Sequence, residues 1–207
     1  MSDKVTSLKM HDLEARAAHR LLTSIVTPRP IAWVSTVSPE GIYNLAPFSF
    51  FNAVAGSPPT VMISIGSRND APKDTLLNIE ATGEFVVNLV DEAHAEAMNL
   101  TSANLPYGQN EFNIAGLEAV PSIEVRPPRV ANVPVAMEAK LTQLVPVKDT
   151  YSTLVLGQVV CFHIRDGLLL PDGVVDSMKM HLISRLGGDG YTTMGDYFEL
   201  GRPQVTR

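Results

Sequence analysis

The sequence predicts a mainly β protein, a closed or partly open antiparallel barrel of about six strands with short helices at its periphery. Six segments are rich in apolar and β-branched residues, whereas only two or three short segments have helical spacing. Strands and helices do not alternate regularly, as they do around parallel sheets. The 207 residues contain no repeat, low-complexity tract or linker. We therefore expect a single domain over 1–207, with a helical extension over 1–25 and a tail over 192–207.

The first element is expected to be a short amphipathic helix over residues 12–25. Apolar residues recur every four positions along this segment and would form one face of the helix. Asp12 can cap its first turn. Pro28 and Pro30 prevent the helix from continuing and hold Arg29 in an extended conformation.

A β-hairpin is expected to follow over residues 31–54. Its first strand, 31–37, is apolar and β-branched, and the turn 38–41 has proline second and glycine fourth, as in a type I turn. The segment 42–54 would return as the second strand.

The remaining elements follow in order along the chain. We expect strands over 60–65, 84–90, 135–146 and 153–165, and helices over 75–81 and 92–100. Gly83 suits the left-handed residue that ends the first of these helices, and Asp91 can cap the second. The stretch 101–130, which holds several Pro, Asn and Gly residues, is expected to be a long excursion from the sheet.

Composition excludes several classes of protein. Asp and Glu number 22 against 16 Lys and Arg, and the net charge of −6 without a basic block argues against binding to nucleic acid. The single cysteine excludes an intrachain disulfide and a cysteine-rich zinc site. No apolar run is long enough for a membrane helix, and the first twenty residues lack the apolar core of a signal peptide. We therefore expect a cytoplasmic protein that does not bind membranes.

Common catalytic motifs are missing. The sequence has no phosphate loop of the G-x-x-x-x-G-K-[ST] type, no G-x-G-x-x-G between a strand and a helix, no H-E-x-x-H and no G-x-S-x-G. The five histidines are scattered, so we expect no metal centre.

The first candidate binding tract is Ser67–Thr75, which leads into the predicted helix 75–81. A helix N-terminus attracts anions, and Arg68, Lys73 and the Thr75 hydroxyl could add contacts to a phosphate. Asp74 could cap the helix with its carboxylate. The alternative is an ordinary surface helix with solvated cations.

The second candidate tract is the hairpin, with Ser35 and Thr36 on one strand and Asn44–Asn52 on the other. Hydroxyl, amide and backbone groups there could read the edge of a flat heterocycle. Pro47 within a strand marks a bulge or an edge where backbone groups are free. The alternative is that the three phenylalanines of this tract are core residues.

The third candidate tract, His181–Tyr191, contains Arg185 within a glycine-rich turn. The alternative is a plain turn with a solvated arginine. Trp33 is expected in the core, Cys161 as an inert buried thiol and His163 as a structural histidine.

Together these tracts resemble the flavin reductase-like family of FMN-binding split-barrel proteins. The resemblance lies in TPRPIAWVST (27–36), NLAPFSFFNAV (44–54) with SPPTVMISI (57–65), KDTLLNIEATGEFVVNLV (73–90) and SRLGGDGY (184–191). It covers residues 20–191 in the family's order.

The resemblance implies a six-stranded antiparallel Greek-key split barrel and a homodimer that binds FMN non-covalently. The ring and ribityl chain would contact Ser35, Thr36, Asn44, Ala46, Pro47, Ser49 and Phe50. The phosphate would contact Ser64, Arg68, Lys73 and Thr75, with Arg185 and Arg29 as weaker matches. His181 lies outside the motif. Because the cofactor carries the chemistry, we expect no catalytic side chain whose loss would abolish the reaction while FMN stays bound.

By the same resemblance, the protein would be a flavin oxidoreductase that transfers hydride from NAD(P)H to flavin, with a monooxygenase as a partner for the reduced flavin. A non-enzymatic FMN electron carrier on the same barrel is the alternative. A third hypothesis is a barrel that binds another small anion, or an interaction module, which would purify colourless and gain no thermal stability from FMN.

Overall fold

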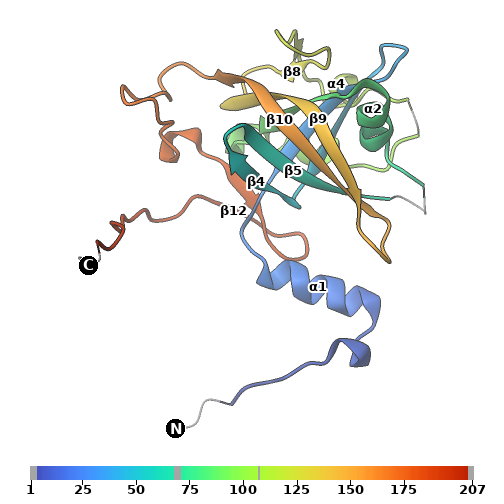
Figure 1. The fold of residues 1–207 in the computed structure, drawn as a ribbon, viewed down its shortest axis with the longest axis vertical. Helices are drawn as coiled ribbons and strands as arrows, with labels where there is room; N and C mark the ends of the chain where they lie inside the picture. The colour runs from blue at the N-terminus through green and yellow to red at the C-terminus, as the bar shows by residue number, and fades with distance from the viewer. Residues whose placement is uncertain (1–3, 68–70, 107, 205–207) are drawn as a thin grey trace.

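A computed structural model describes residues 4–67, 71–106 and 108–204. Its main feature is an antiparallel sheet that curls into a barrel (Figure 1). The strand order is β3 (Tyr43–Phe48), β2 (Ala32–Val37), β6 (Glu84–Leu89), β9 (Val135–Pro146), β10 (Ser152–Ile164), β5 (Pro59–Gly66) and β4 (Phe51–Gly56). The mainly β class is confirmed. The prediction of six strands is wrong, because this sheet has seven and does not close.

The seventh strand arises because the segment predicted as one strand, 42–54, is two. β3 and β4 are the two outer strands of the sheet, and only Ser49 and Phe50 connect them. The chain therefore crosses from one sheet edge to the other within two residues. The carbonyl of Phe50 accepts a hydrogen bond from the Ser64 amide at 2.8 Å, which fixes this crossing against β5. We call the dipeptide Ser49–Phe50 the seam.

Each face of the sheet has its own hydrophobic core. Inside the barrel, Val34, Ile63 and Phe85 pack together with Ile79 of α2 (Asp74–Thr82), the helix predicted over 75–81. The opposite face carries a second core around Trp33, which is fully buried. The excursion predicted over 101–130 covers this second core. Side chains that alternate along a strand therefore pack into a hydrophobic core on either face of the sheet, and neither face is left open to solvent at these positions.

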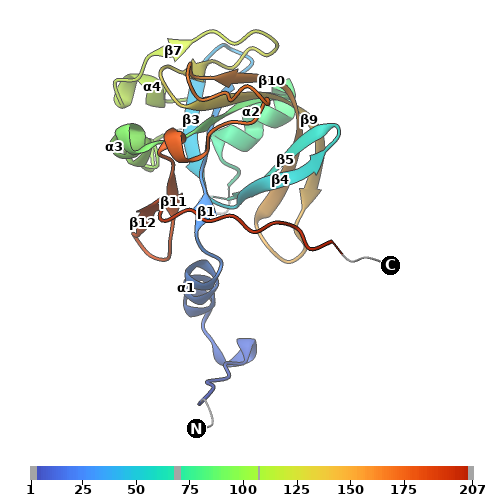
Figure 2. The ribbon, with the colours of Figure 1, turned by 90° about the vertical axis from the view of Figure 1, so that its left-hand side faces the viewer.

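Smaller elements surround the barrel (Figure 2). The helical segments are η1 (Met10–Asp12), α1 (Ala15–Ile25), η2 (Glu92–His94), α3 (Ala95–Leu100), α4 (Glu111–Ile114) and η3 (Met178–Met180). The short strands are β1 (Arg29–Pro30) with β11 (Ile183–Arg185) and β12 (Tyr191–Thr193), and the pair β7 (Ala119–Val120) and β8 (Arg129–Val130). The glycine-rich third tract therefore contains β11 and the first residue of β12, two strands that were not predicted.

None of the three aspartates makes the predicted capping hydrogen bond with its side chain, although Asp91 does occupy the N-cap position, directly before η2. Asp12 lies in η1, and α1 begins three residues later. Asp74 lies inside the first turn of α2 and accepts a hydrogen bond from the Gly108 amide at 3.2 Å. Asp91 contacts the His94 ring at 2.5 Å. The predicted glycine end of α2 is confirmed, since Gly83 has a φ of 71°.

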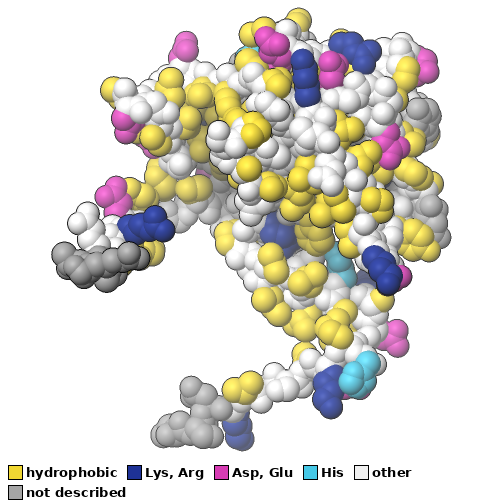
Figure 3. All heavy atoms as spheres, viewed as in Figure 1, with side chains coloured by type: hydrophobic (Ala, Val, Ile, Leu, Met, Phe, Trp, Pro, Cys, Tyr) yellow, Lys and Arg dark blue, Asp and Glu magenta, His cyan; other side chains and the backbone are white. Residues whose placement is uncertain are grey.

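α1 extends away from the barrel, and the segment before it extends further still (Figures 1 and 2). Its apolar face is not covered: Leu22 is 53% exposed and Ile25 67%. Apolar side chains also gather on the barrel surface over β4 and β5, above α1 in this view (Figure 3). Among the described residues, we find no helix with the length and apolar character to cross a bilayer.

Candidate functional site

Two neighbouring cavities lie beside the seam. The α1 cavity, of about 370 Å³, is enclosed by α1, β1, the seam and β11. The α2 cavity, of about 600 Å³, lies at the N-terminus of α2. Pro47 and Ser102 line both cavities. The two spaces are therefore adjacent, and each has the size of an ordinary small-molecule site.

The α2 cavity combines positive and negative groups. Lys73 precedes the first turn of α2, and its ammonium lies 5.3 Å from the ring centre of Phe48. The helix N-terminus adds partial positive charge. Asp74 and Glu111 line the same cavity with carboxylates. The positive charge that could hold an anion is therefore concentrated at Lys73 and the helix tip.

A buried polar network forms the wall between the α2 cavity and the core. The side-chain oxygen of Asn44, Oδ1, accepts hydrogen bonds from the Thr75 hydroxyl at 2.8 Å and the Thr36 hydroxyl at 3.3 Å. Asn78 donates to Thr36 at 3.0 Å. The network fixes the orientation of Asn44, a buried residue that is only 6% exposed. A phosphate contact from Thr75 would have to replace its bond to Asn44.

Glu111 completes this network from α4. Its carboxylate accepts from the Asn44 amide at 3.2 Å and from the Leu45 backbone amide at 2.9 Å. Burial raises the pKa of the Glu111 carboxyl, and the nearby Asp74 charge acts in the same direction, while these hydrogen bonds lower it in part. Glu111 was not predicted as a site residue, because the segment around it in the excursion contains no recognisable motif.

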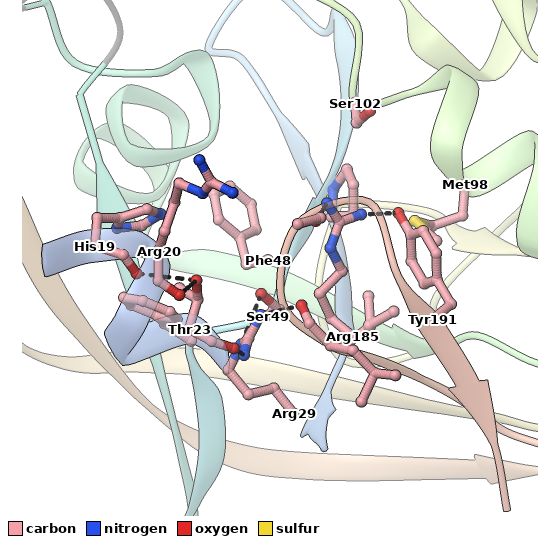
Figure 4. A pocket seen from close by; sticks show the side chains of 15 residues that line it. His19, Arg20, Thr23, Arg29, Phe48, Ser49, Met98, Ser102, Arg185 and Tyr191 are labelled. Atoms are coloured by element: carbon pink, nitrogen blue, oxygen red, sulfur yellow. Dashed lines mark hydrogen bonds between the residues drawn. The ribbon is translucent and has the colours of Figure 1, made fainter. Parts of the chain in front are cut away.

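The α1 cavity has a cationic rim and an apolar floor. Figure 4 shows Arg29, Arg185 and Tyr191 around it, with Phe48 behind. Arg185 donates to the Tyr191 hydroxyl and its guanidinium carbon lies 4.5 Å from the Tyr191 ring centre. Tyr191 lies in the third tract but was not predicted as a site residue. His19 of α1, which also lines this cavity, was not predicted either, because a single histidine on a helix is no binding motif.

Arg29 has a structural task at this site. Its guanidinium donates to the carbonyls of Thr23 at 2.5 Å, Val26 at 2.6 Å and Leu186 at 2.9 Å, and lies 3.4 Å from the Ser49 hydroxyl. Burial, with a contribution from Arg185, lowers the pKa of this guanidinium. Arg29 therefore ties the end of α1 to the β11 turn and to the seam.

The structure brings most of the predicted site residues to the two cavities. The α1 cavity is lined by Arg29, Pro47, Ser49, Phe50 and Arg185, and the α2 cavity by Asn44, Ala46, Pro47, Lys73 and Thr75. Lys73 and Asn44 thus face the same space.

Three predicted residues are placed differently. Ser35 is fully buried on the opposite face of β2, where its hydroxyl donates to the Pro128 carbonyl at 2.5 Å. Thr36 is fully buried and reaches the α2 cavity only through Asn44. Ser64 is half-buried on β5 and lines neither cavity. Arg68 lies outside the described residues.

Comparison with known proteins agrees with this architecture. A family model described as "Flavin reductase like domain" matches residues 24–178. Nitrilotriacetate monooxygenase component B from Bacillus cereus is similar at 35% identity and a TM-score of 0.92, covering 96% of this chain and 100% of that one. The 2-nitrobenzoate 2-nitroreductase NbaA of Pseudomonas fluorescens is similar at 33% identity and a TM-score of 0.87, covering 96% of each chain.

A relative from Halalkalibacterium halodurans, described as an uncharacterized protein, is 38% identical over 205 residues. That alignment covers 97% of this chain and 98% of the relative. The similarity therefore extends over α1 and the C-terminal segment as well as the barrel.

Proposed function

The chain belongs to the flavin reductase-like family, and from this premise we propose that it is an FMN-dependent oxidoreductase that uses NAD(P)H and supplies reduced flavin to a monooxygenase. One observation carries the proposal: a cationic helix tip and a polar, aromatic seam open onto adjacent cavities that share Pro47. FMN has a charged phosphate at one end and a flat ring at the other. The two cavities offer matching chemistry for these ends.

We propose that Lys73 and the N-terminus of α2 hold the phosphate in the α2 cavity. Thr75 would join them by exchanging its bond to Asn44 for one to the phosphate. Phosphate contacts from Arg68 and Ser64, which the family resemblance implies, stay a prediction. The fully buried Ser35 and Thr36 are left out of the proposed contacts, with Thr36 acting only as a support for Asn44.

The ring would lie along the seam. Ala46, Pro47, Ser49 and Phe50 offer backbone and hydroxyl groups at its edge, while Phe48 provides apolar surface. Bound FMN would supply the electron-transfer chemistry of the reaction. The residues of the chain would bind it, orient it and exclude water, so the proposal needs no general acid or base from the protein.

The monooxygenase partner is supported by the similarity to nitrilotriacetate monooxygenase component B. The similarity to the nitroreductase NbaA supports a second candidate function, direct reduction of a small nitroarene at the protein. The cationic rim of the α1 cavity, with Arg29 and Arg185, would suit a carboxylated substrate. Release of reduced flavin into solution would favour the supply of reduced flavin to a monooxygenase. Reduction that occurs only when the nitroarene binds to the protein would favour the nitroreductase function.

We propose that the molecule works as a homodimer. The uncovered apolar side chains of α1 and the exposed Val54 of β4, at 54%, are the surfaces that a second copy would cover. Residues of α1 and the seam, which leads directly into β4, line the α1 cavity, so the dimer would also shield this cavity.

The proposed cofactor role is tested by comparing FMN with riboflavin, which lacks the phosphate. The purified protein should be yellow and should oxidise NADH or NADPH when flavin is present. Lys73→Met should weaken FMN binding by about tenfold to a hundredfold, the effect of one charge-assisted hydrogen bond, and leave riboflavin binding unchanged.

Lys140→Met, at an exposed lysine of β9, is the matched control and should bind FMN normally. A colourless protein without measurable FMN affinity contradicts the cofactor assignment. Equal losses for FMN and riboflavin would place Lys73 away from the phosphate. Stopped-flow reduction by a protein donor alone, with no reaction toward NAD(P)H, would establish the electron carrier instead.

A further inference from the structure

A compact group of three metal-ligating side chains lies away from both cavities. Glu138 of β9, Cys161 and His163 of β10 each present a ligand atom, and these atoms lie within 4.8 Å of one another. Glu138 is fully buried, and the other two are half-buried. We call this group the β9–β10 cluster.

The sheet register creates the cluster. Cys161 and His163 are two residues apart on one strand and therefore point to the same face. Between Val159 and Cys161 the register with β9 shifts, and this irregularity places Cys161 opposite Glu138. The ligands come from two strands with an irregular register, so the cluster has no short sequence motif.

The arrangement does not match a catalytic triad. In a triad, the two ring nitrogens of the histidine serve different partners, one the nucleophile and the other the carboxylate. Here the same nitrogen, His163 Nε2, lies 2.5 Å from Glu138 Oε1 and 3.6 Å from Cys161 Sγ. The three ligand atoms lie within 4.8 Å of one another, so small side-chain movements would bring all three to one ion.

The nitrogen–sulfur distance is close to that of a zinc site. Zinc bonds of about 2.0 Å to nitrogen and about 2.3 Å to sulfur in a tetrahedron put those two atoms about 3.5 Å apart, near the 3.6 Å observed. The distance from His163 Nε2 to Glu138 Oε1 would have to widen from 2.5 Å to about 3.3 Å. A small rotation of the imidazole, whose side chain is 17% exposed, would provide this.

Backbone hydrogen bonds orient the Glu138 carboxylate for metal binding. Its Oε1 accepts from the Ile123 amide at 2.8 Å, and Oε2 accepts from the Glu124 amide at 2.6 Å and the Val125 amide at 3.2 Å. Oε2 is thus fully used, whereas Oε1 keeps one position, which now faces His163. Ligating carboxylates are commonly oriented by such outer hydrogen bonds.

We propose that Glu138, Cys161 and His163 bind one zinc ion, with water as the fourth ligand. Binding would release the thiol proton of Cys161 to solvent and shift the imidazole proton of His163 from Nε2 to Nδ1. The thiolate and carboxylate then balance the two positive charges of the ion. The set of one sulfur, one nitrogen and one oxygen ligand suits this borderline-soft metal.

A solvent-connected cavity of about 460 Å³ reaches the cluster at His163, which is the cluster residue that lines it. Arg129 and Arg165 line it too, but Arg129 donates to the Pro121 carbonyl, and Arg165 pairs with Asp91. This cavity shares no lining residue with the α1 or α2 cavity. The ion would therefore stabilise the 123–125 segment against the sheet and leave flavin binding unchanged.

The test measures zinc and cobalt binding by the full chain after treatment with a chelator. Elemental analysis after reloading should give one zinc per chain, and zinc should raise the melting temperature. Cobalt should give a thiolate-to-metal absorption band in a difference spectrum of the same sample. Cys161→Ser should lower zinc affinity more than about 100-fold, beyond the loss from an outer-shell residue, and should remove the cobalt band.

The matched control is His94→Gln, which breaks another short histidine–carboxylate contact, with Asp91, that has no cysteine beside it. It should bind zinc as the parent does. His163→Gln, which keeps a donor for Glu138, should lose zinc while its FMN affinity stays at the parent value. Zinc binding that Cys161→Ser leaves unchanged, or no binding above a non-specific background, would overturn the proposal.

Discussion

Glu111 is a carboxyl group at the boundary between the α2 cavity and the core, with only 6% of the residue exposed. Three side chains depend on its position, because it orients Asn44, whose side-chain oxygen in turn accepts hydrogen bonds from the hydroxyls of Thr36 and Thr75. A proton bound to this carboxyl removes a negative charge from the wall of the proposed phosphate site. The protonation state of Glu111 is therefore relevant to stability and to anion binding.

The raised pKa of Glu111 predicts a pH dependence of stability. The folded state holds the Glu111 proton more tightly than the unfolded state, whose pKa is near the ordinary value of 4.5. The free energy of unfolding should therefore fall as pH rises from that value through the folded-state pKa. Glu111→Gln, which cannot ionise, should lose this part of the dependence in urea unfolding over a pH series.

Glu96→Gln provides the control, because Glu96 is an exposed glutamate of α3. It should leave the pH profile of the parent unchanged. A profile for Glu111→Gln that coincides with that of the parent would contradict the assigned pKa shift.

Individual residues also show how far sequence reasoning reaches at this scale. Lys73, Asn44 and Pro47 meet as expected, because each lies in a tract with a clear local signature. Ser35 and Thr36 could not both line one ligand, since neighbours on a strand point to opposite faces. That alternation was available from the sequence. The role of Glu111 was not, because only the tertiary path of the excursion brings it to Asn44.

Among the elements, the centre of β10 requires glycine. A Cβ at Gly157 would lie 2.3 Å from Cζ of Phe85, a fully buried side chain of β6. Gly157→Ala should therefore lower the free energy of unfolding by about 1–3 kcal/mol through overpacking. Denaturant unfolding measures the loss.

The same substitution should cost less in a Phe85→Leu background, where the ring is absent. The two losses would then be non-additive, as expected for residues in contact. Additive losses would mean that the Phe85 ring is not the obstacle.

The attachment of α1 depends on a second close approach. A Cβ at Gly187 would lie 2.9 Å from Cβ and 3.0 Å from Cα of Ser24, and the latter is helix backbone. Gly187→Ala should displace the end of α1 and strain the bonds of Arg29 to Thr23 and Leu186. Hydrogen exchange should become faster in α1 while the barrel strands keep their protection.

Gly195→Ala is the matched control, since a Cβ there meets no atom within 4 Å. It should leave exchange in α1 unchanged. Unaltered protection in Gly187→Ala would show that the helix does not rely on this contact.

The elements predicted best are those with long, uninterrupted patterns. The predicted strand 135–146 coincides with β9, and the prediction 153–165 is within one residue of β10 at each end. The break at the seam was missed because the run 42–54 has strand-like composition throughout, and only the curling of the sheet brings its two edge strands near enough for the crossing. β11 and β12 were missed because three-residue strands in a glycine-rich tract have no periodicity to detect.

For the whole molecule, the uncovered apolar face of α1 leads to a prediction about assembly. Sedimentation should give twice the mass of one chain. Ile25→Glu, at a residue 67% exposed, should shift the protein toward a single chain because it places a charge on the surface that we expect a second copy to cover. Circular dichroism should show that the barrel stays folded.

Arg16→Glu, on the opposite side of α1, is the control and should keep the parent's mass. A parent protein that sediments as a single chain at all concentrations would contradict the proposed homodimer. Its exposed apolar face would then need another occupant.

The seam has a consequence for how such a protein can change during evolution. Because two residues both join the open borders of the barrel and line the ligand space, any insertion or deletion there would alter the pocket and misalign the borders in a single event. Loops elsewhere can lengthen without that double penalty. New specificity should therefore arise by exchanging side chains at the seam, with changes in chain length restricted to the outer turns.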